Sequence, residues 1–411
     1  MLRQNKFSST ITIIGTALAM MMIMTLIVAD VIKTISIAPE KNRSRTLYAN
    51  YIRKSNLEDT WSRSGSLTYD MVKDYLLKLE TPELISVDGS TYTQDMVTTE
   101  NLDRSKESRV KLTDDAYWKI MDFSFVAGKP FTHEEFRSGV RNAIVSESTA
   151  RELFPGQDAM GKTIMIKHFP YNITGIVKDV SPVFKNAYGD IWTLYSSLKD
   201  YDKERGFSCT LLMLAKNKKD LPAIIAEVKE CEVKYTADNP EEKLFIAGPH
   251  SVKFSGSNIR GNNQAEVEEF MKKQRRQQIF IFAVLLLVPA VNLSGFSLTQ
   301  IKKRMSEIGI RKAFGAKRRV ILVQVLYENF ITSLIGGIIG LILSYFVIIL
   351  MRNFILGIGA EQAIPFGALV SWPVFLAVFV GALLINLLSA GIPAYRASRI
   401  NIVNSINQND K

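Results

Sequence analysis

One segment of this 411-residue chain has the letters of a nucleotide-binding loop. Gly156 to Thr163 reads GQDAMGKT, which matches the phosphate-loop pattern G-x-x-x-x-G-K-[ST]. In such a loop the glycines follow a buried strand and open a helix, so that backbone N–H groups face the phosphates. Here a helical pattern and Pro155 precede the motif, and the alternating pattern TIMIK follows it. Because that order is reversed, the sequence predicts a structural turn.

The other residues that could do chemistry are scattered. The three histidines, His133, His168 and His250, lack the spacing of metal ligands. No Ser/His/Asp or Cys/His arrangement emerges, so we expect no catalytic residue, cofactor or metal site in this chain. Cys209 and Cys231 could form a disulfide in an oxidising compartment, although nothing in the sequence places them within reach of each other.

The strongest functional signal is a short basic segment, residues 302–319. Eight of its residues are Lys or Arg, and its only acid is Glu307. It separates two long apolar stretches, which is typical of a cytoplasmic loop between membrane spans. Such a loop is too short to be a domain, and we expect it to contact another protein.

Four apolar stretches without charged side chains are long enough to cross a bilayer as helices. The first could instead be a signal peptide, but its apolar part exceeds the usual length and no small-residue cleavage site follows. The stretches cover residues 7–29, 277–301, 329–351 and 362–395.

The basic residues set the expected orientation, with both termini and the 302–319 loop in the cytoplasm and residues 30–276 outside. Lys272, Lys273, Arg275 and Arg276 oppose this assignment, but long translocated domains largely escape the charge rule. The net charge of +11 is explained by membrane-flanking cations, so we expect contact with membrane lipids and no nucleic acid.

The expected fold is a membrane protein with four transmembrane α-helices and a large extracytoplasmic α+β domain between the first two. The order of segments is an N-terminal stub and first span (1–29), the outside domain (30–276), the second span (277–301), the basic loop (302–319), the third span (320–351), a short outside loop (352–371), the fourth span (372–395) and a cytoplasmic tail (396–411).

Within the outside domain the patterns predict mixed helices and strands. We expect helices over 67–80, 147–154 and 221–231, and a single helix from about Asn263 into the second span. Ser146 is the expected N-cap of the second of these helices. The expected strands are 143–145, 163–166, 173–180, 209–215, 244–246 and 252–254.

Several segments resemble known families. RMSEIGIRKAFGAKRRVILVQVLYENF from Arg304, followed by GGIIG, resembles the FtsX-like permease signature of MacB-type ABC transporters. NAIVSESTARELFPGQDAMGKTIMI from Asn142, with YNITGIVKDV, resembles the MacB-like periplasmic core domain, in which the phosphate-loop lookalike belongs to the fold. YWKIMDFSFVAGKPFTHEEF is similar to the preceding part of that domain, and GIPAYRASRINIVNSI is similar to the closing segment of the family.

The resemblance implies a permease subunit in a bacterial inner membrane. Two permeases, identical or related, pair and bind cytoplasmic ABC ATPase subunits, which hold the ATP and Mg. Because about six residues precede the first span, we expect the ATPase to be a separate chain. ATP-driven motion would pass through the loop to the outside domain, and a periplasmic adaptor is a possible further partner. The substrate stays open.

The resemblance implies that the segment SEIGIRKAFGA of the basic loop is the part that couples the permease to the ATPase. Glu307 and Arg311 can pair four residues apart on one helix face, and Gly315 can end that helix. An ordinary positive-inside loop without a partner is the alternative. The remaining coupling candidates are Ile308, Gly309 and Lys312.

The third span has glycines at positions 336, 337 and 340. Small residues let two membrane helices approach closely, so Gly336, Gly337 and Gly340 predict a helix-packing face or a dimer seam.

Two other functions remain as alternatives. The chain could be a membrane-anchored extracytoplasmic sensor without transport activity, but its cytoplasmic segments are too short to hold an output domain. It could be a secondary transporter or channel, but those need polar residues along a path within the spans. Co-purification with an ATPase discriminates among these functions.

Overall fold

The computed structural model describes residues 6–32, 34–199, 201, 207–255, 261–303, 310 and 314–351, and the single positions 376, 379–381, 384 and 395. The chain divides into two compact units. The helical unit holds residues up to Val31 and most of the chain after Gln274, and the α+β unit holds residues 32–273.

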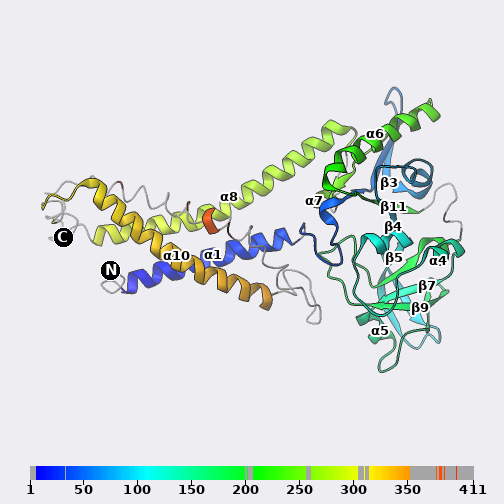
Figure 1. Cartoon of the computed structure of the whole chain (residues 1–411), viewed down its shortest axis with the longest axis horizontal. Helices are drawn as coiled ribbons and strands as arrows, with labels where there is room; N and C mark the ends of the chain where they lie inside the picture. Colours follow the sequence, from blue (N-terminus) through cyan, green and yellow to red (C-terminus); the bar gives the residue numbers. More distant parts are fainter. Residues whose placement is uncertain are drawn as a thin grey trace. The chain divides into compact units, whose positions relative to one another are not determined.

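The helical unit contains α1 (Lys6–Val31), α10 (Arg318–Leu350) and all but the first turns of α8 (Gln264–Lys303). Helices α1 and α10 pack side by side (Figure 1). In the described part of the chain one segment, Phe330–Leu350, meets the length and apolarity of a membrane span, and Ile13–Ile27 is a shorter apolar helix. The predicted second span lies on α8. The predicted fourth span, residues 372–395, and the loop 352–371 lie almost entirely outside the described residues.

Helix α8 is continuous over 40 residues and runs from the α+β unit into the helical unit. At 1.5 Å per residue this corresponds to about 60 Å. The helix passes through Pro289, whose ring removes one backbone N–H donor without ending the helix. The prediction of one helix from about Asn263 into the second apolar stretch is therefore confirmed.

The α+β unit is built on a mixed sheet of 13 strands. The order along the sheet is β12-β2-β3-β11-β4-β5-β10-β7-β9-β6, with β1 beside β11 and β13, and β8 beside β4 and β9. The strands are β1 (Thr46–Ala49), β2 (Tyr51–Asn56), β3 (Ser62–Thr68), β4 (Leu84–Thr99), β5 (Ser105–Thr113), β6 (Phe125–Gly128), β7 (Asn142–Ser146), β8 (Thr163–Ile166), β9 (Phe169–Val177), β10 (Ile191–Leu194), β11 (Ser208–Leu214), β12 (Glu242–Ile246) and β13 (His250–Ser251).

Short helices cover this sheet, and several of them start at capped residues. Ser146 accepts from the Thr149 N–H at the start of α5, as predicted, and Thr132 and Glu135 form a capping box on α4. The helices are α2 (Tyr69–Met71), a π-helical turn (Val72–Leu76), α3 (Asp115–Ile120), α4 (His133–Ser138), α5 (Glu147–Leu153), α6 (Leu221–Asp238) and α7 (Val252–Ser255), with 3-10 turns at Arg43–Arg45, Tyr195–Ser197 and Lys218–Asp220.

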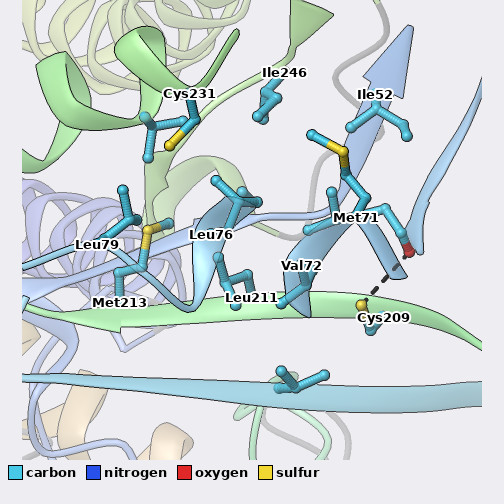
Figure 2. Close-up of a cluster of buried hydrophobic side chains, with 14 of the residues drawn as sticks. Ile52, Met71, Val72, Leu76, Leu79, Cys209, Leu211, Met213, Cys231 and Ile246 are labelled. Carbon is cyan, nitrogen blue, oxygen red and sulfur yellow. Dashed lines mark hydrogen bonds between the residues drawn. The ribbon is translucent and has the colours of Figure 1, made fainter. Parts of the chain in front are cut away.

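Separate apolar clusters form the core of the α+β unit. In one, the π-helical turn and α6 pack on β2, β11 and β12, as Figure 2 shows for Leu76, Leu211 and Ile246. In another, α5 packs on β7, β8, β9 and β10 through Leu153, Ile164 and other buried side chains. Burial of this apolar area is the main force that holds the helices on the sheet.

One predicted helix is shorter than expected, and one predicted strand was wrong. The helix expected over 67–80 spans Tyr69–Leu76, as α2 followed by the π-helical turn, because Leu67 is buried in β3 opposite Cys209. Residues 252–254 form the single turn α7, which buries Phe254, in place of a strand. There tertiary burial overrides a short apolar pattern that fits either a helix or a strand.

Candidate functional site: a basic segment and the helices that hold it

The basic segment is only partly described by the structure. The predicted coupling residues Glu307, Ile308, Gly309, Arg311 and Lys312 lie outside the described residues. At its end, the Phe314 N–H donates to the Ile310 carbonyl at 3.0 Å, which is the spacing of an α-helical turn. Gly315 follows with φ of +88°, a left-handed conformation that favours glycine and is common just beyond a helix. Helix α10 then begins at Arg318.

Phe314 was missed by the sequence reasoning. It is 88% exposed, the largest value among the apolar residues that the structure describes, and Ile310 is 53% exposed. The two residues are four apart, so in a helix they share one face. The four-residue spacing of Ile310 and Phe314 was the available signal for an exposed apolar face. In a basic loop between two spans, however, the same spacing is also expected for side chains that pack against the membrane helices.

The glycines of α10 make close helix contacts within this chain. An added Cβ at Gly336 would lie 2.7 Å from Thr16 Cβ, and one at Gly340 would lie 2.5 Å from the Ala17 carbonyl oxygen. Gly337 instead faces the ring of Phe379. Gly336 and Gly340 therefore let the backbones of α10 and α1 approach, as small residues do in membrane helix pairs. The dimer seam stays a prediction.

The residues that follow α1 are fixed to the α+β unit by a buried ion pair. Arg43 Nε lies 2.7 Å from Glu40 Oε2, and both side chains are 1% exposed. Arg43 also donates to the carbonyl of Ile32, directly after the end of α1, while Glu40 accepts the N–H groups of Asn186 and Ala187. A buried pair that is fully hydrogen-bonded in this way holds its surroundings rigidly.

The first turns of α8 pack on the α+β unit by one apolar face. Val267 is fully buried with Ala247 and Phe254, and Phe270 and Met271 pack on the same cluster. The start of the helix is capped, because Glu266 N–H donates to the Asn263 side chain. The α+β unit thus fixes both the segment after α1 and the beginning of α8.

The phosphate-loop lookalike is a turn between α5 and β8, as predicted. Gly156 and Gly161 have φ of +70° and +73°, so they serve as turn glycines. Lys162 lies over the ring of Phe154 and donates to the side chain of Gln157. Helix precedes and strand follows, so no helix N-terminus opens at the motif.

The two cysteines are free thiols in the structure, so the possible disulfide is not formed. Both belong to one apolar cluster (Figure 2). The thiol of Cys209 donates to the Leu67 carbonyl, and that of Cys231 donates to the Tyr75 carbonyl. Burial raises the pKa of both thiols, which disfavours the reactive thiolate.

Among the described residues no group of three or more His, Cys, Asp or Glu side chains could hold a metal ion. His250 lies on β13, and its Nε2 has no hydrogen-bond partner among the described residues. Burial, with the nearby Lys229 ammonium, lowers its pKa to about 4, so the ring is neutral near pH 7.

Comparison with known proteins identifies the family of this chain. The MacB-like periplasmic core domain matches residues 9–230, and the FtsX-like permease C-terminal domain matches residues 279–402. The chain belongs to the family of FtsX-like ABC transporter permeases with a MacB-like core domain.

Its relatives are distant in sequence. The uncharacterized ABC transporter permease YknZ of Bacillus subtilis is 24% identical over 73% of this chain and 70% of that protein. A macrolide export ATP-binding/permease protein MacB of Yersinia pestis is 24% identical over 71% of this chain, but the match spans only 42% of that relative. The solved extracellular domain of a YknZ transporter from Gram-positive bacteria is 15% identical to this chain, with a TM-score of 0.37. The match covers 48% of this chain and 99% of that domain.

Proposed function

We propose that this chain is the mechanical subunit of an ABC transporter, which transmits the motion of a cytoplasmic ATPase to the α+β unit outside the membrane. The proposal rests on α8, a continuous helix whose first turns pack on the α+β unit through Val267, Phe270 and Met271. Its last residue, Lys303, lies in the basic segment. A continuous helix is held by backbone hydrogen bonds along its length, with one donor missing at Pro289, and it resists bending, so displacement of one end moves the other.

The basic segment is the proposed contact with the ATPase. The exposed pair Ile310 and Phe314 supplies an apolar anchor, and the surrounding cations supply orientation. An exposed aromatic side chain bordered by charges is typical of a protein interface. The ordered string around Glu307 and Arg311 gives the same assignment through the family.

The proposed topology has four crossings of a bacterial inner membrane, with both termini in the cytoplasm. Support comes from α1, where exposed apolar side chains recur at every fourth residue, as expected for a face against lipid. These side chains are Ile14, Leu18, Met22 and Leu26. The proposed partners are an ABC ATPase, which supplies ATP and Mg chemistry, and a second permease copy or paralogue. A periplasmic adaptor is a further proposed partner.

The first experiment interrupts α8. Gln277 is exposed on this helix, and Gln277→Pro removes an N–H donor and clashes with the preceding turn. We expect the variant to bind the ATPase normally but to lose ATP-driven movement of the α+β unit, measured by distance labels in reconstituted membranes. Gln277→Ala is the matched control. Wild-type movement in the proline variant would refute transmission through α8.

The second experiment reverses charges in the basic segment. We expect Glu307→Arg and Arg311→Glu each to reduce ATPase binding and vanadate-sensitive turnover without unfolding the permease. The double variant restores an i, i+4 pair but exchanges the charges, so it separates internal pairing from docking. Wild-type ATPase binding and turnover in both single variants would refute the assignment of coupling to Glu307 and Arg311, and failure of any ATPase to bind the wild type would favour the sensor alternative.

A further inference from the structure

A compact group of four cations lies on α8 one turn before its apolar stretch. We call Lys272, Lys273, Arg275 and Arg276 the basic band; all four are exposed. Their sequence, KKQRR, contains no acid. Lys272 lies 3.9 Å from Glu268, and the other three have no ion pair among the described residues. Glu268 and Glu269 stand four residues before Lys272 and Lys273 and offset part of this charge, whereas Arg275 and Arg276 have no acid three or four residues away on the helix. Because like charges at this spacing repel each other, the two arginines are unfavourable unless a group outside the helix neutralises them.

The band continues into an exposed apolar face. Ile279 is four residues after Arg275, and Phe280 is four residues after Arg276, so each pair lies on one side of the helix. Ile279 and Phe280 are 62% and 68% exposed. One face of α8 thus changes from cationic to apolar within a single turn, about 5 Å.

This change indicates what the face contacts. A surface that docks a folded protein groups its apolar anchors inside a polar rim, whereas a helix that enters a bilayer changes from charged to apolar at the headgroup layer. Helical side chains tilt toward the N-terminus, so Arg275 and Arg276 extend away from the apolar stretch and toward headgroups while their methylene stems stay on apolar surface.

We propose that the basic band binds the phosphates of anionic phospholipid headgroups on the outer side of the membrane and fixes the level at which α8 leaves the bilayer. This inference rests on the membrane crossing of α8 in the proposed function. It also accounts for a cation cluster on the side where basic residues are otherwise disfavoured. Guanidinium groups bind phosphate oxygens in a bidentate manner, and each cation strengthens attraction to an anionic surface.

The test compares two full-length variants in detergent solution with added phosphatidylglycerol or phosphatidylcholine, with bound lipid counted by native mass spectrometry. One variant changes all four band residues to Gln. The control removes four exposed lysines elsewhere on the α+β unit, Lys216, Lys218, Lys219 and Lys234, by the same substitution. We expect the wild type and the control to prefer phosphatidylglycerol, and the band variant to bind it at least about tenfold more weakly.

Equal phosphatidylglycerol binding by the two variants would overturn the proposal, and so would equal binding of the two lipids by the wild type. A separate measurement tests the crossing itself. In proteoliposomes, Ile281→Cys should resist a membrane-impermeant maleimide, with the wild type and its two buried thiols as background. Labelling of this cysteine would refute the crossing; protection together with equal lipid binding would refute the lipid proposal alone.

Discussion

Gly340→Ala tests how closely α1 and α10 pack. The added Cβ would lie 2.5 Å from the Ala17 carbonyl oxygen and 2.7 Å from Met20 Cβ, whereas an ordinary contact needs at least 3.4 Å. The backbone oxygen cannot rotate away, so the helices must separate locally by about 0.9 Å, the difference between 3.4 and 2.5 Å. Overpacking of this kind costs about 1–3 kcal/mol, partly offset by about 1 kcal/mol of helix propensity. We expect a net loss of up to about 2 kcal/mol.

Hydrogen exchange of the α1 amides in the full chain measures this loss. A loss of about 2 kcal/mol, the upper end of this range, corresponds to exchange that is roughly 30 times faster. Gly337→Ala is the matched control on the same helix, because its Cβ meets only the Phe379 ring, which can move, and Gly381→Ala meets nothing within 4 Å. If Gly340→Ala and Gly337→Ala exchange at the same rate, the close approach of α1 and α10 is wrong.

Three further predictions concern the α+β unit. Lys162→Ala should leave nucleotide turnover of the transporter complex unchanged; a strong loss would restore the phosphate-loop interpretation. Arg43→Met should lower the free energy of unfolding by about 3–5 kcal/mol, because Glu40 would remain buried and unpaired, and denaturant titration against Lys41→Met, an exposed pair, would reveal it. Since the pKa of His250 is lowered from 6.5 to about 4, the folded state binds fewer protons than the unfolded state, and stability present above pH 6.5 falls toward pH 4 by at most about 3 kcal/mol. His250→Gln should show a smaller fall; identical pH profiles would contradict this effect.

The sequence predicts best those elements whose local signals agree. The strand at 143–145, the Ser146 cap and the helix after it were predicted because hydrophobic pattern and capping chemistry point to the same structure. The strands β8 and β9 and the long α8 were also predicted from their patterns, although β9 begins four residues earlier than expected. The helix expected over 67–80 exists only over Tyr69–Leu76, because its first residues pair with β11 as the end of β3.

Much of the candidate site needed the structure. That Gly336 and Gly340 face α1 of the same chain depends on a contact between residues more than 300 positions apart, for which spacing carries no signal. The buried pair of Arg43 and Glu40 looks like two ordinary surface charges in the sequence. The roles of Glu307 and Arg311 stay predictions, because these residues lie outside the described part of the chain.

Because α8 is one long helix, insertions into it can distinguish whether it transmits motion by rotating about its axis or by sliding along it. Each residue inserted into a helix turns everything beyond it by about 100° and lengthens the axis by 1.5 Å. One extra residue after Gln278 would therefore mainly misalign the two ends angularly, while seven extra residues would nearly restore their phase but add about 10 Å. A transporter that tolerates the seven-residue insertion and fails with the single one works by twisting, and the opposite result identifies a piston.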